Sequence, residues 1–287
     1  MSSRITAFYL ARACEGLAPM REFVSSYRRY YAGVDHELIV LFKGFKSARK
    51  RQQTQALFTG LSFVPLEIAE GGFDIGSYAY AATKVRTDFL FFLNTFSTVL
   101  ADNWLEKIYC QAQKNEIGLV GATASYQSLY SPLRARWNRA RQKSFLARLI
   151  KKPLLLTQWN RATALRRFPP FPNPHVRTNG FMVKRSLFLA LSKPRFKDKM
   201  DALLFESGPH SLTRQVLLTK KQVCIVDKEG ACFTAGEWKE SCPFWNKAQK
   251  NLLIADNQTR RFDRLPLEKR LALQIKAWGE SNQEHPQ

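Results

Sequence analysis

The sequence predicts an α/β protein with a mostly parallel sheet flanked by helices. Three observations support this class: strand and helix patterns alternate through the first half, several strands are almost wholly apolar, and the links are short. Strands that are apolar on both sides are typical of a sheet covered on both faces. With 287 residues, 45% of them hydrophobic, the chain is long enough to bury one substantial core.

The elements of the first half follow from the spacing of the apolar residues. We expect strands at 4–10, 37–42, 61–68, 88–93 and 117–122, and helices at 20–31, 48–59 and 75–85. Asp102 can provide the N-cap of a further helix that carries Trp104. Pro65 predicts that its strand is an edge strand or carries a bulge, because proline cannot donate a ladder hydrogen bond. The run from Ile5 to Ala11 is broken by Arg12 and has no cleavage-site pattern, so it predicts a strand and no signal peptide.

The second half is organised differently. Residues 134–167 are basic and predict helix in two pieces broken at Pro153, and a proline-rich linker follows at 169–174. Later expectations are strands at 180–183 and 222–226, a turn at 227–230, a helix after Gly208-Pro209 and a final helix at 267–278. We therefore expect one domain over 1–287, in which a basic helical insertion at 131–172 separates 1–130 from 173–262, and a C-terminal helix and tail occupy 263–287.

The net charge of +22 is the strongest compositional signal, and it is concentrated in one region. Between Ile117 and Lys197 there are 17 lysines or arginines and no aspartate or glutamate. A solvated face normally mixes both signs, so this stretch predicts an anionic neighbour: phospholipid, nucleic acid, a phosphorylated substrate or an acidic polysaccharide. Phe145, Leu146, Leu149 and Ile150 share one helical face within it, which favours attachment to an anionic membrane.

The cysteines, the histidines and the lack of long apolar stretches narrow the class of protein further. The five cysteines have no metal-ligand spacing and no C-x-x-C pair, so we expect buried free thiols in a reducing cytosol. The four histidines are far apart in sequence, and we expect no metal site. No apolar stretch of about 18 residues occurs, so no membrane-spanning helix is expected.

Several stretches together resemble inverting glycosyltransferases of the GT-A fold, in the manner of family two and closest to uncharacterised bacterial proteins near the rhamnan-synthesis group. They are Phe73-Asp-Ile-Gly-Ser-Tyr78, Asp88-Phe-Leu-Phe-Phe-Leu-Asn-Thr-Phe-Ser97, Asn103-Trp-Leu105, Gly118-Leu-Val-Gly-Ala122, Asn173-Pro-His-Val-Arg-Thr-Asn179 and Phe205-Glu-Ser-Gly208. The resemblance covers roughly 4–260 and rests on the order and spacing of these motifs. It implies that 1–130 binds a nucleotide sugar and that 173–262 holds the acceptor and the catalytic base.

The sequence departs from the family at Asn94-Thr95-Phe96, which stands where the family has D-x-D. The family uses this acidic pair to hold a divalent cation on the donor diphosphate, and neutral side chains cannot do that strongly. Three alternatives remain: a nearby acid holds the metal, lysine and arginine neutralise the phosphates directly, or catalysis has been lost. The cofactor is therefore unknown, and we expect weak or absent dependence on divalent metal.

The candidate site residues are chosen on two grounds: their position at strand ends and the family resemblance. Asn94, Thr95 and Ser97 follow the fourth strand, and ligands of parallel sheets bind at the carboxyl ends of strands. Asp74 is a nucleotide contact by resemblance or an N-cap by position. Arg177 and Asn179 alternate with His175 along an extended segment, where phosphate or acceptor contact and buried hydrogen bonding are both open. By resemblance Glu206, before a helix start, is the catalytic base, with Asp201 as its rival.

The function these observations favour is transfer of a sugar from a nucleotide-sugar donor to a lipid-linked or cell-surface glycan. The expected location is the cytoplasm, peripherally on the inner face of the membrane. Two alternatives stay open: a nucleic-acid-binding protein, motivated by the charge alone, and a non-catalytic transferase-like subunit. No helix-turn-helix, zinc-finger or RNA-recognition signature supports nucleic acid, and we do not expect it as a partner.

Overall fold

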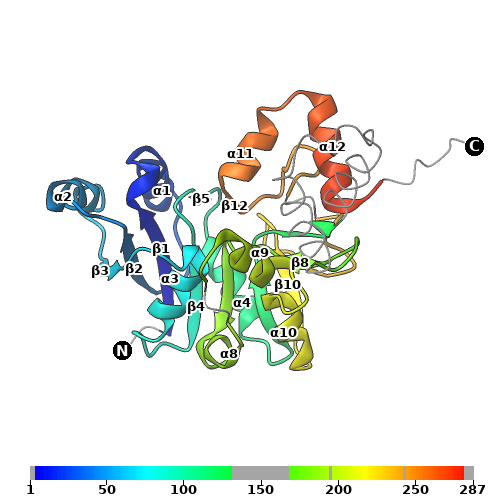
Figure 1. Ribbon diagram of the computed structural model, residues 1–287, viewed down its shortest axis with the longest axis horizontal. Helices are drawn as coiled ribbons and strands as arrows, with labels where there is room; N and C mark the ends of the chain where they lie inside the picture. The colour runs from blue at the N-terminus through cyan, green and yellow to red at the C-terminus, as the bar shows by residue number, and fades with distance from the viewer. Residues whose placement is uncertain (1–3, 131–167, 194–195, 242–243, 281–287) are drawn as a thin grey trace, which may run out of the picture.

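The computed structural model describes residues 4–130, 168–193, 196–241 and 244–280. An eight-stranded sheet runs through the middle of the molecule in the order β11-β10-β6-β9-β4-β1-β2-β3 (Figure 1). Its strands are β1 (Ile5–Arg12), β2 (Glu37–Lys43), β3 (Val64–Ile68), β4 (Phe89–Leu93), β6 (Ile117–Gly121), β9 (Phe181–Lys184), β10 (Gln222–Val226) and β11 (Cys232–Thr234). Two small strand pairs complete the set: β5 (Thr98–Val99) pairs with β12 (Ile254–Ala255), and β7 (Ala124–Ser125) pairs with β8 (His175–Val176).

The predicted fold class is confirmed, because the sheet is mostly parallel and helices flank it. β1 pairs in parallel with both β2 and β4, β2 with β3, and β6 with β10. Only β9, which lies between β4 and β6, and the terminal β11 run antiparallel. β3 is an edge strand, as Pro65 predicts, since its free side needs no ladder donor.

Helices cover both faces of the sheet. They are α1 (Ala18–Arg29), α2 (Ala48–Ala56), α3 (Phe73–Ala82), α4 (Trp104–Ala112), α8 (Arg185–Ala190), α9 (Lys199–Ser207), α10 (Leu212–Leu218), α11 (Asn257–Asp263) and α12 (Leu267–Trp278), with the short 3₁₀ turn η1 (Ala13–Glu15). Because side chains alternate along a strand, β1 sends Phe8 to one core and Tyr9 to the other. Phe23 of α1 and Trp104 of α4 pack on the Tyr9 side.

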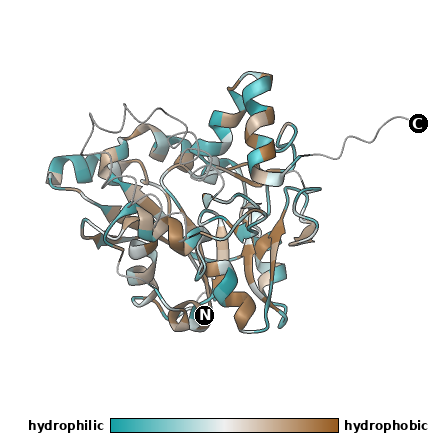
Figure 2. Cartoon of the chain, turned by 45° about the vertical axis from the view of Figure 1, so that its right-hand side comes forward, coloured by the Kyte–Doolittle hydropathy of each residue, from teal (hydrophilic) through white to brown (hydrophobic). Residues whose placement is uncertain are grey.

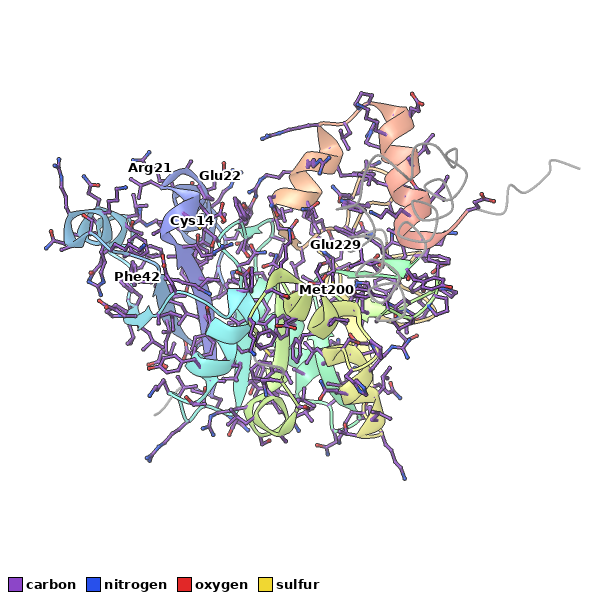
Figure 3. All side chains as sticks on the ribbon, viewed as in Figure 1. Cys14, Arg21, Glu22, Phe42, Met200 and Glu229 are labelled. Carbon is purple, nitrogen blue, oxygen red and sulfur yellow. The ribbon has the colours of Figure 1, made fainter. Side chains whose placement is uncertain are left out.

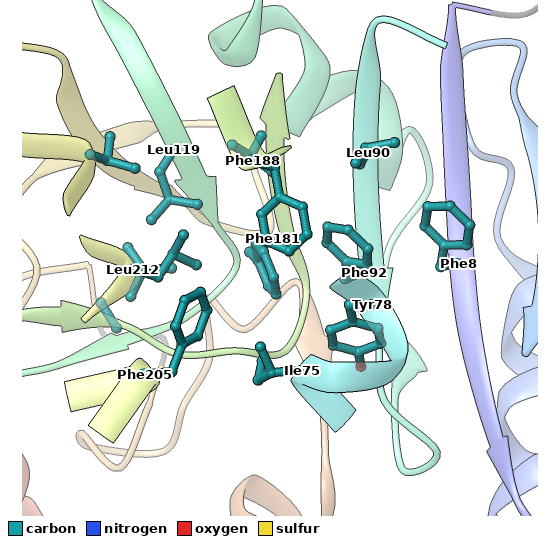
Figure 4. Packing of buried hydrophobic residues seen from close by; sticks show 14 of the residues in the cluster. Phe8, Ile75, Tyr78, Leu90, Phe92, Leu119, Phe181, Phe188, Phe205 and Leu212 are labelled. Atoms are coloured by element: carbon teal, nitrogen blue, oxygen red, sulfur yellow. The ribbon is translucent and has the colours of Figure 1, made fainter. Parts of the chain in front are cut away.

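The core on the Phe8 side is a ladder of aromatic rings across neighbouring strands and helices (Figure 4). Phe92 of β4 lies 5.3 Å from Phe8, 4.9 Å from Phe181 and 4.7 Å from Tyr78, measured between ring centroids. Rings of this size each bury a large apolar area, so they fix how α3 sits on the sheet. Figure 2 shows the resulting pattern, with apolar strands inside and polar segments on the outer helices.

Several local expectations need correction. The N-cap of α4 is Asn103, while the carboxylate of Asp102 accepts a hydrogen bond from the amide of Tyr31 instead, at 2.8 Å. Cys14, Cys110 and Cys232 are exposed, and among the described cysteines only Cys224 is a buried thiol. Cys232 lies on β11, the terminal strand of the sheet, whereas Cys224 lies on β10, which has a strand on either side.

The basic insertion lies almost wholly outside the described residues. Of 131–172, the structure describes only 168–172, so the predicted helices of 134–167 and the apolar face at 145–150 stay predictions. The division of the chain into two functional halves is likewise still a prediction. Within the described ranges, none of the helices has the length and apolar character needed to cross a membrane.

Candidate active site

The candidate site lies at the carboxyl ends of β1, β2 and β4, which meet at one edge because these strands are parallel. A cavity of about 580 Å³ opens at the ends of β1 and β2. Its lining consists of Arg12, Ala13, Cys14, Lys43, Gly44, Phe45, Lys46, Ser47, Lys50, Glu70 and Gly71. Figure 3 shows one of them, Cys14, beyond the end of β1 and beneath α1.

Positive charge dominates this cavity. Arg12, Lys43, Lys46 and Lys50 line it, against the single carboxylate of Glu70. Lys46 lies 3.8 Å from Glu70 with both side chains largely exposed, so their mutual attraction is weak and Lys46 stays available to another anion. The arrangement suits a ligand with more than one negative charge.

Lys43 and Asp74 form the inner wall beside this cavity. Lys43 is 7% exposed and donates hydrogen bonds to the backbone oxygen of Phe73 and, at 2.9 Å, to Ser77 Oγ. Burial lowers the pKa of Lys43 despite the nearby Asp74 carboxylate. Burial also raises the pKa of Asp74, against the opposing effect of Arg12, whose Nη1 is 3.8 Å from Asp74 Oδ1, and of Lys43. The Lys43 ammonium and the Asp74 carboxylate therefore influence each other in a place from which water is partly excluded.

The turn into α3 is conformationally strained. Gly71, Gly72 and Phe73 all have positive φ, at 106°, 67° and 49°. Glycine takes this conformation freely, but Phe73 does so at a cost. Gly72 is the N-cap and Asp74 is the second helical residue, so the N-cap interpretation of Asp74 is wrong. The turn brings the start of α3 and the Asp74 carboxylate to the cavity edge.

Asn94, Thr95, Ser97 and Asn179 come together, as the sequence predicts for the end of β4. Asn179 Oδ1 accepts from the Asn94 amide at 2.9 Å and from Ser97 Oγ at 2.7 Å. Asn94 Oδ1 accepts from the Phe96 amide at 2.9 Å, and Thr95 Oγ1 donates to the Leu10 oxygen at 2.7 Å. These bonds occupy the side chains within the loop, which favours a role in holding its shape. Direct contact with a donor remains a prediction for all four.

Arg177 is held in a nearly buried ion pair. Its Nη2 lies 2.8 Å from Asp256 Oδ2, and the two side chains are 13% and 1% exposed. The guanidinium also lies over the ring of Phe244, 4.1 Å from the centroid. Asp256 caps α11 by accepting from the amides of Gln258 and Thr259. This geometry favours the buried-bonding alternative for Arg177, although phosphate contact is not tested.

Glu206 precedes the predicted helix start, but it lies in the last turn of α9, where irregular structure was expected. The chain bends at Gly208, and α10 begins only after its N-cap, Ser211. Thr178 Oγ1 donates to Glu206 Oε2 at 2.5 Å, which fixes one carboxylate oxygen; among the described residues Oε1 has no hydrogen-bond partner. The charge of Glu206 contributes to the raised pKa of Asp74, which indicates that both carboxylates share one electrostatic environment.

Asp201 is placed quite differently. It is the third residue of α9, and its Oδ2 accepts hydrogen bonds from the amides of Lys197 and Asp198 in a capping box. Asp201 is more than one helical turn from Glu206 along α9. Asp201 is bonded into the start of α9, whereas Glu206 lies beside Thr178, next to Asn179, so the geometry favours Glu206 over Asp201 as the base.

His175 is a buried neighbour of this carboxylate. Its Nδ1 donates to the Asn173 oxygen at 2.8 Å, and burial lowers its pKa although the Glu206 charge acts in the opposite direction. His175 is therefore neutral near pH 7, with Nε2 as a hydrogen-bond acceptor.

The residues after β4 do not fit a divalent cation. A magnesium or manganese ion prefers carboxylate oxygens, whereas Asn94, Thr95 and Ser97 offer neutral groups already hydrogen-bonded within the loop. In the described ranges, no cluster of three or more His, Cys, Asp or Glu side chains could hold a metal ion. Metal dependence is still untested.

The sequence interpretation missed the basic cavity. Arg12 and Lys43 are the last residues of β1 and β2, and Lys46, Ser47 and Lys50 come directly after β2. The same rule that singled out Asn94, polar side chains at the carboxyl end of a buried strand, would have found them.

Comparison with known proteins gives only distant likenesses. No protein-family model matches the chain, and no curated protein sequence matches it. Among solved structures it is similar to the mannosyltransferase PcManGT from Pyrobaculum calidifontis, in complex with GDP-Man and Mn²⁺, at 11% identity and TM-score 0.48, covering 82% of this chain and 57% of that one. It is also similar to S. aureus TarS, at 11% identity and TM-score 0.33, covering 41% of this chain and 21% of that one. For TarS 1–349 the identity is 10% and the TM-score 0.40, covering 70% of this chain and 53% of that one.

The chain thus spans little more than half the length of these proteins at most. All three TM-scores lie below 0.5, a level of likeness that does not establish a shared activity.

Proposed function

We propose that the chain transfers a sugar from a nucleotide-sugar donor to a hydroxyl group of a glycan or lipid-linked acceptor. The observation that carries the proposal is the cavity at the ends of β1 and β2, lined by Arg12, Lys43, Lys46 and Lys50. The Asp74 carboxylate is 3.8 Å from Arg12, and Glu206 bonds to Thr178, next to Asn179 at the end of β4. A diphosphate needs concentrated positive charge, and a sugar hydroxyl needs a proton acceptor. Both requirements are met at one edge of the sheet.

In this proposal the donor diphosphate binds in the basic cavity. Lysine and arginine donate charge-assisted hydrogen bonds to phosphate oxygens and stabilise the charge that develops on the leaving group. Lys46 and Lys50 are exposed and can reach a ligand, while buried Lys43 holds the start of α3 and its Asp74. The cavity volume of about 580 Å³ is in the range of small-ligand sites.

Glu206 acts as the base. The acceptor oxygen attacks the anomeric carbon of the donor sugar as Glu206 Oε1 takes its proton. The bond from that carbon to the diphosphate oxygen breaks, and the nucleoside diphosphate leaves with the electron pair. Thr178 supports this role because its hydroxyl bonds Oε2 and orients the carboxylate. Attack opposite the leaving group inverts the anomeric carbon, in agreement with the family resemblance.

The binding test uses calorimetric titration with UDP and GDP in the presence of a chelator. We expect binding, and we expect Lys46→Met/Lys50→Met to weaken it about 10-fold at low salt, since exposed charges on phosphate contribute modestly each. Lys84→Met/Lys114→Met removes the same charge at the opposite ends of α3 and α4 and is the matched control. Equal losses in both double variants would indicate general electrostatics and refute a site in the cavity.

The catalytic test is Glu206→Gln, which keeps the size of the side chain and removes its basicity. Release of nucleoside diphosphate from the donor that binds should fall by about 10²- to 10⁴-fold while donor affinity stays unchanged. A variant that folds and turns over normally would transfer the assignment to Asp201. Donor binding without any turnover in the unsubstituted chain would favour the non-catalytic transferase-like subunit, an alternative consistent with the carboxylate-free Asn94 loop.

The cytoplasmic location on the inner face of an anionic membrane remains part of the proposal. It is supported by the +22 charge and by the acid-free stretch, of which 131–167 and 194–195 lie outside the described residues.

A further inference from the structure

Helix α12 carries a stripe of exposed apolar side chains. Leu267, Leu271 and Ile275 are 63%, 48% and 48% exposed. Their spacing of four residues places them along one side of the helix over about 12 Å. The opposite side packs inward, where Leu273 packs against the core and Ala277 is fully buried. α12 is therefore apolar on both sides, which the packing of the described chain does not require.

The segment that carries this stripe is basic. Between 257 and 278 the chain has six lysines or arginines and two acidic residues. Arg261, Arg264 and Lys269 are exposed, whereas Arg260 is used internally, donating to Thr98 Oγ1 at 2.7 Å. Arg260 thereby holds α11 against the loop after β4, so α12 extends from a fixed support.

Three kinds of partner could cover an apolar stripe with a basic border. A second copy of the chain would bring another +22 charge against it and would be repelled at low salt. A nucleic acid offers phosphates but no apolar layer for leucine and isoleucine side chains. A bilayer with anionic lipids offers both, since its headgroup charges lie directly above hydrocarbon.

We propose that α12 is an interfacial membrane helix that inserts Leu267, Leu271 and Ile275 between anionic lipids. α11 and α12 stand on the side of the sheet where the strands end and the basic cavity opens (Figure 1). The helix would thus attach the protein close to its candidate site. None of the residues that line the donor cavity belongs to α12, so the proposal stands independently of the proposed sugar transfer.

The depth test uses the full chain with Leu271→Trp and vesicles that contain phosphatidylglycerol with brominated acyl chains. Bromine quenches only tryptophans that enter the hydrocarbon, so this variant should lose more fluorescence than the unsubstituted chain. Leu218→Trp is the matched control, because Leu218 is 81% exposed on α10, at the far end of the sheet. No extra quenching at position 271 while the protein is vesicle-bound would overturn the proposal and assign the attachment to another part of the chain.

The affinity test compares Leu267→Ser/Leu271→Ser/Ile275→Ser with Leu217→Ser/Leu218→Ser. Co-sedimentation with phosphatidylcholine–phosphatidylglycerol vesicles should weaken about 100-fold for the first variant, since each half-exposed side chain can still bury roughly a kilocalorie per mole of apolar surface, and little for the second. Equal weakening in both would also overturn the proposal. So would a concentration-dependent dimer in lipid-free solution that the first variant abolishes, because a second copy would then cover the stripe. Nucleotide titration without vesicles reports on the donor cavity separately.

Discussion

The buried ion pair of Arg177 with Asp256 permits a quantitative test of whether Arg177 serves the fold or a ligand. The change is Arg177→Met, which keeps the apolar length of the side chain and removes its charge. Asp256, 1% exposed, would lose its partner at 2.8 Å and remain as an uncompensated buried carboxylate. Removing one partner of such a pair typically costs about 3–5 kcal/mol.

We expect the free energy of unfolding to fall by about 3 kcal/mol, the lower end of that range. Asp256 keeps the hydrogen bonds from the amides of Gln258 and Thr259, which still stabilise its charge in part. At about 2–4 °C per kcal/mol for a protein near this size, Tm should drop by roughly 6–12 °C. Urea denaturation followed by circular dichroism measures the free energy, and a thermal melt measures Tm.

The double variant Arg177→Met/Asp256→Asn is the control. It removes the unpaired charge, so it should be more stable than the sum of the two single variants predicts, with a coupling of about 1–3 kcal/mol. Nucleotide affinity at a temperature where both proteins are folded should be unchanged by Arg177→Met. If this variant lost less than about 1 kcal/mol of stability and at least 10-fold in nucleotide affinity, Arg177 would be a ligand contact and the structural interpretation would be refuted.

Three further predictions concern pH, backbone strain and metal. Burial lowers the pKa of His175 from its ordinary value of 6.5, so below pH 6.5 the unfolded chain binds more protons than the folded one, and stability should fall as the pH decreases from about 6.5 through the lowered pKa. His175→Gln should flatten this part of a plot of urea midpoint against pH. An unchanged plot would contradict the assignment. Phe73→Gly relieves a φ of 49° but loses the packing of the ring, so we expect the free energy of unfolding to change by no more than about 1 kcal/mol in chemical denaturation. A loss of more than about 2 kcal/mol would show that strain is not the larger effect. Nucleotide affinity should be the same with chelator and with Mn²⁺, because Asn94 and its loop supply no carboxylate; restoration of lost binding by Mn²⁺ would require another acid, such as Asp74, to hold the ion.

Local sequence patterns determined much of the secondary structure. The final helix at 267–278 has the predicted bounds. Helical spacing of apolar residues is a pattern within one segment, so it can be recognised without knowing what the helix packs against. The buried strands β2 and β4 were predictable since their apolar runs suit only a sheet covered on both sides. Pro65 predicted that β3 is an edge strand or carries a bulge, and the structure has it at the edge.

Candidate residues at strand ends were partly predictable for the same reason. Asn94 was found because it follows an apolar strand directly, and Glu206 because its motif resembles a family. The helix predicted after Gly208-Pro209 is present as α10, but α9, which ends before Gly208 and carries Glu206, was not predicted. Local breaker residues mark a boundary without saying which element lies on each side.

The sequence by itself therefore determined the α/β class, the apolar strands and the concentration of positive charge, all of which depend on neighbouring residues or on composition. Only the tertiary structure decided that β9 runs antiparallel between β4 and β6, since an apolar strand can pair in either direction. It also decided that Arg12 and Lys43 share a cavity and that Arg177 finds Asp256, 79 positions along the numbered chain. Such contacts depend on strand order, which long-range packing selects and no local pattern encodes.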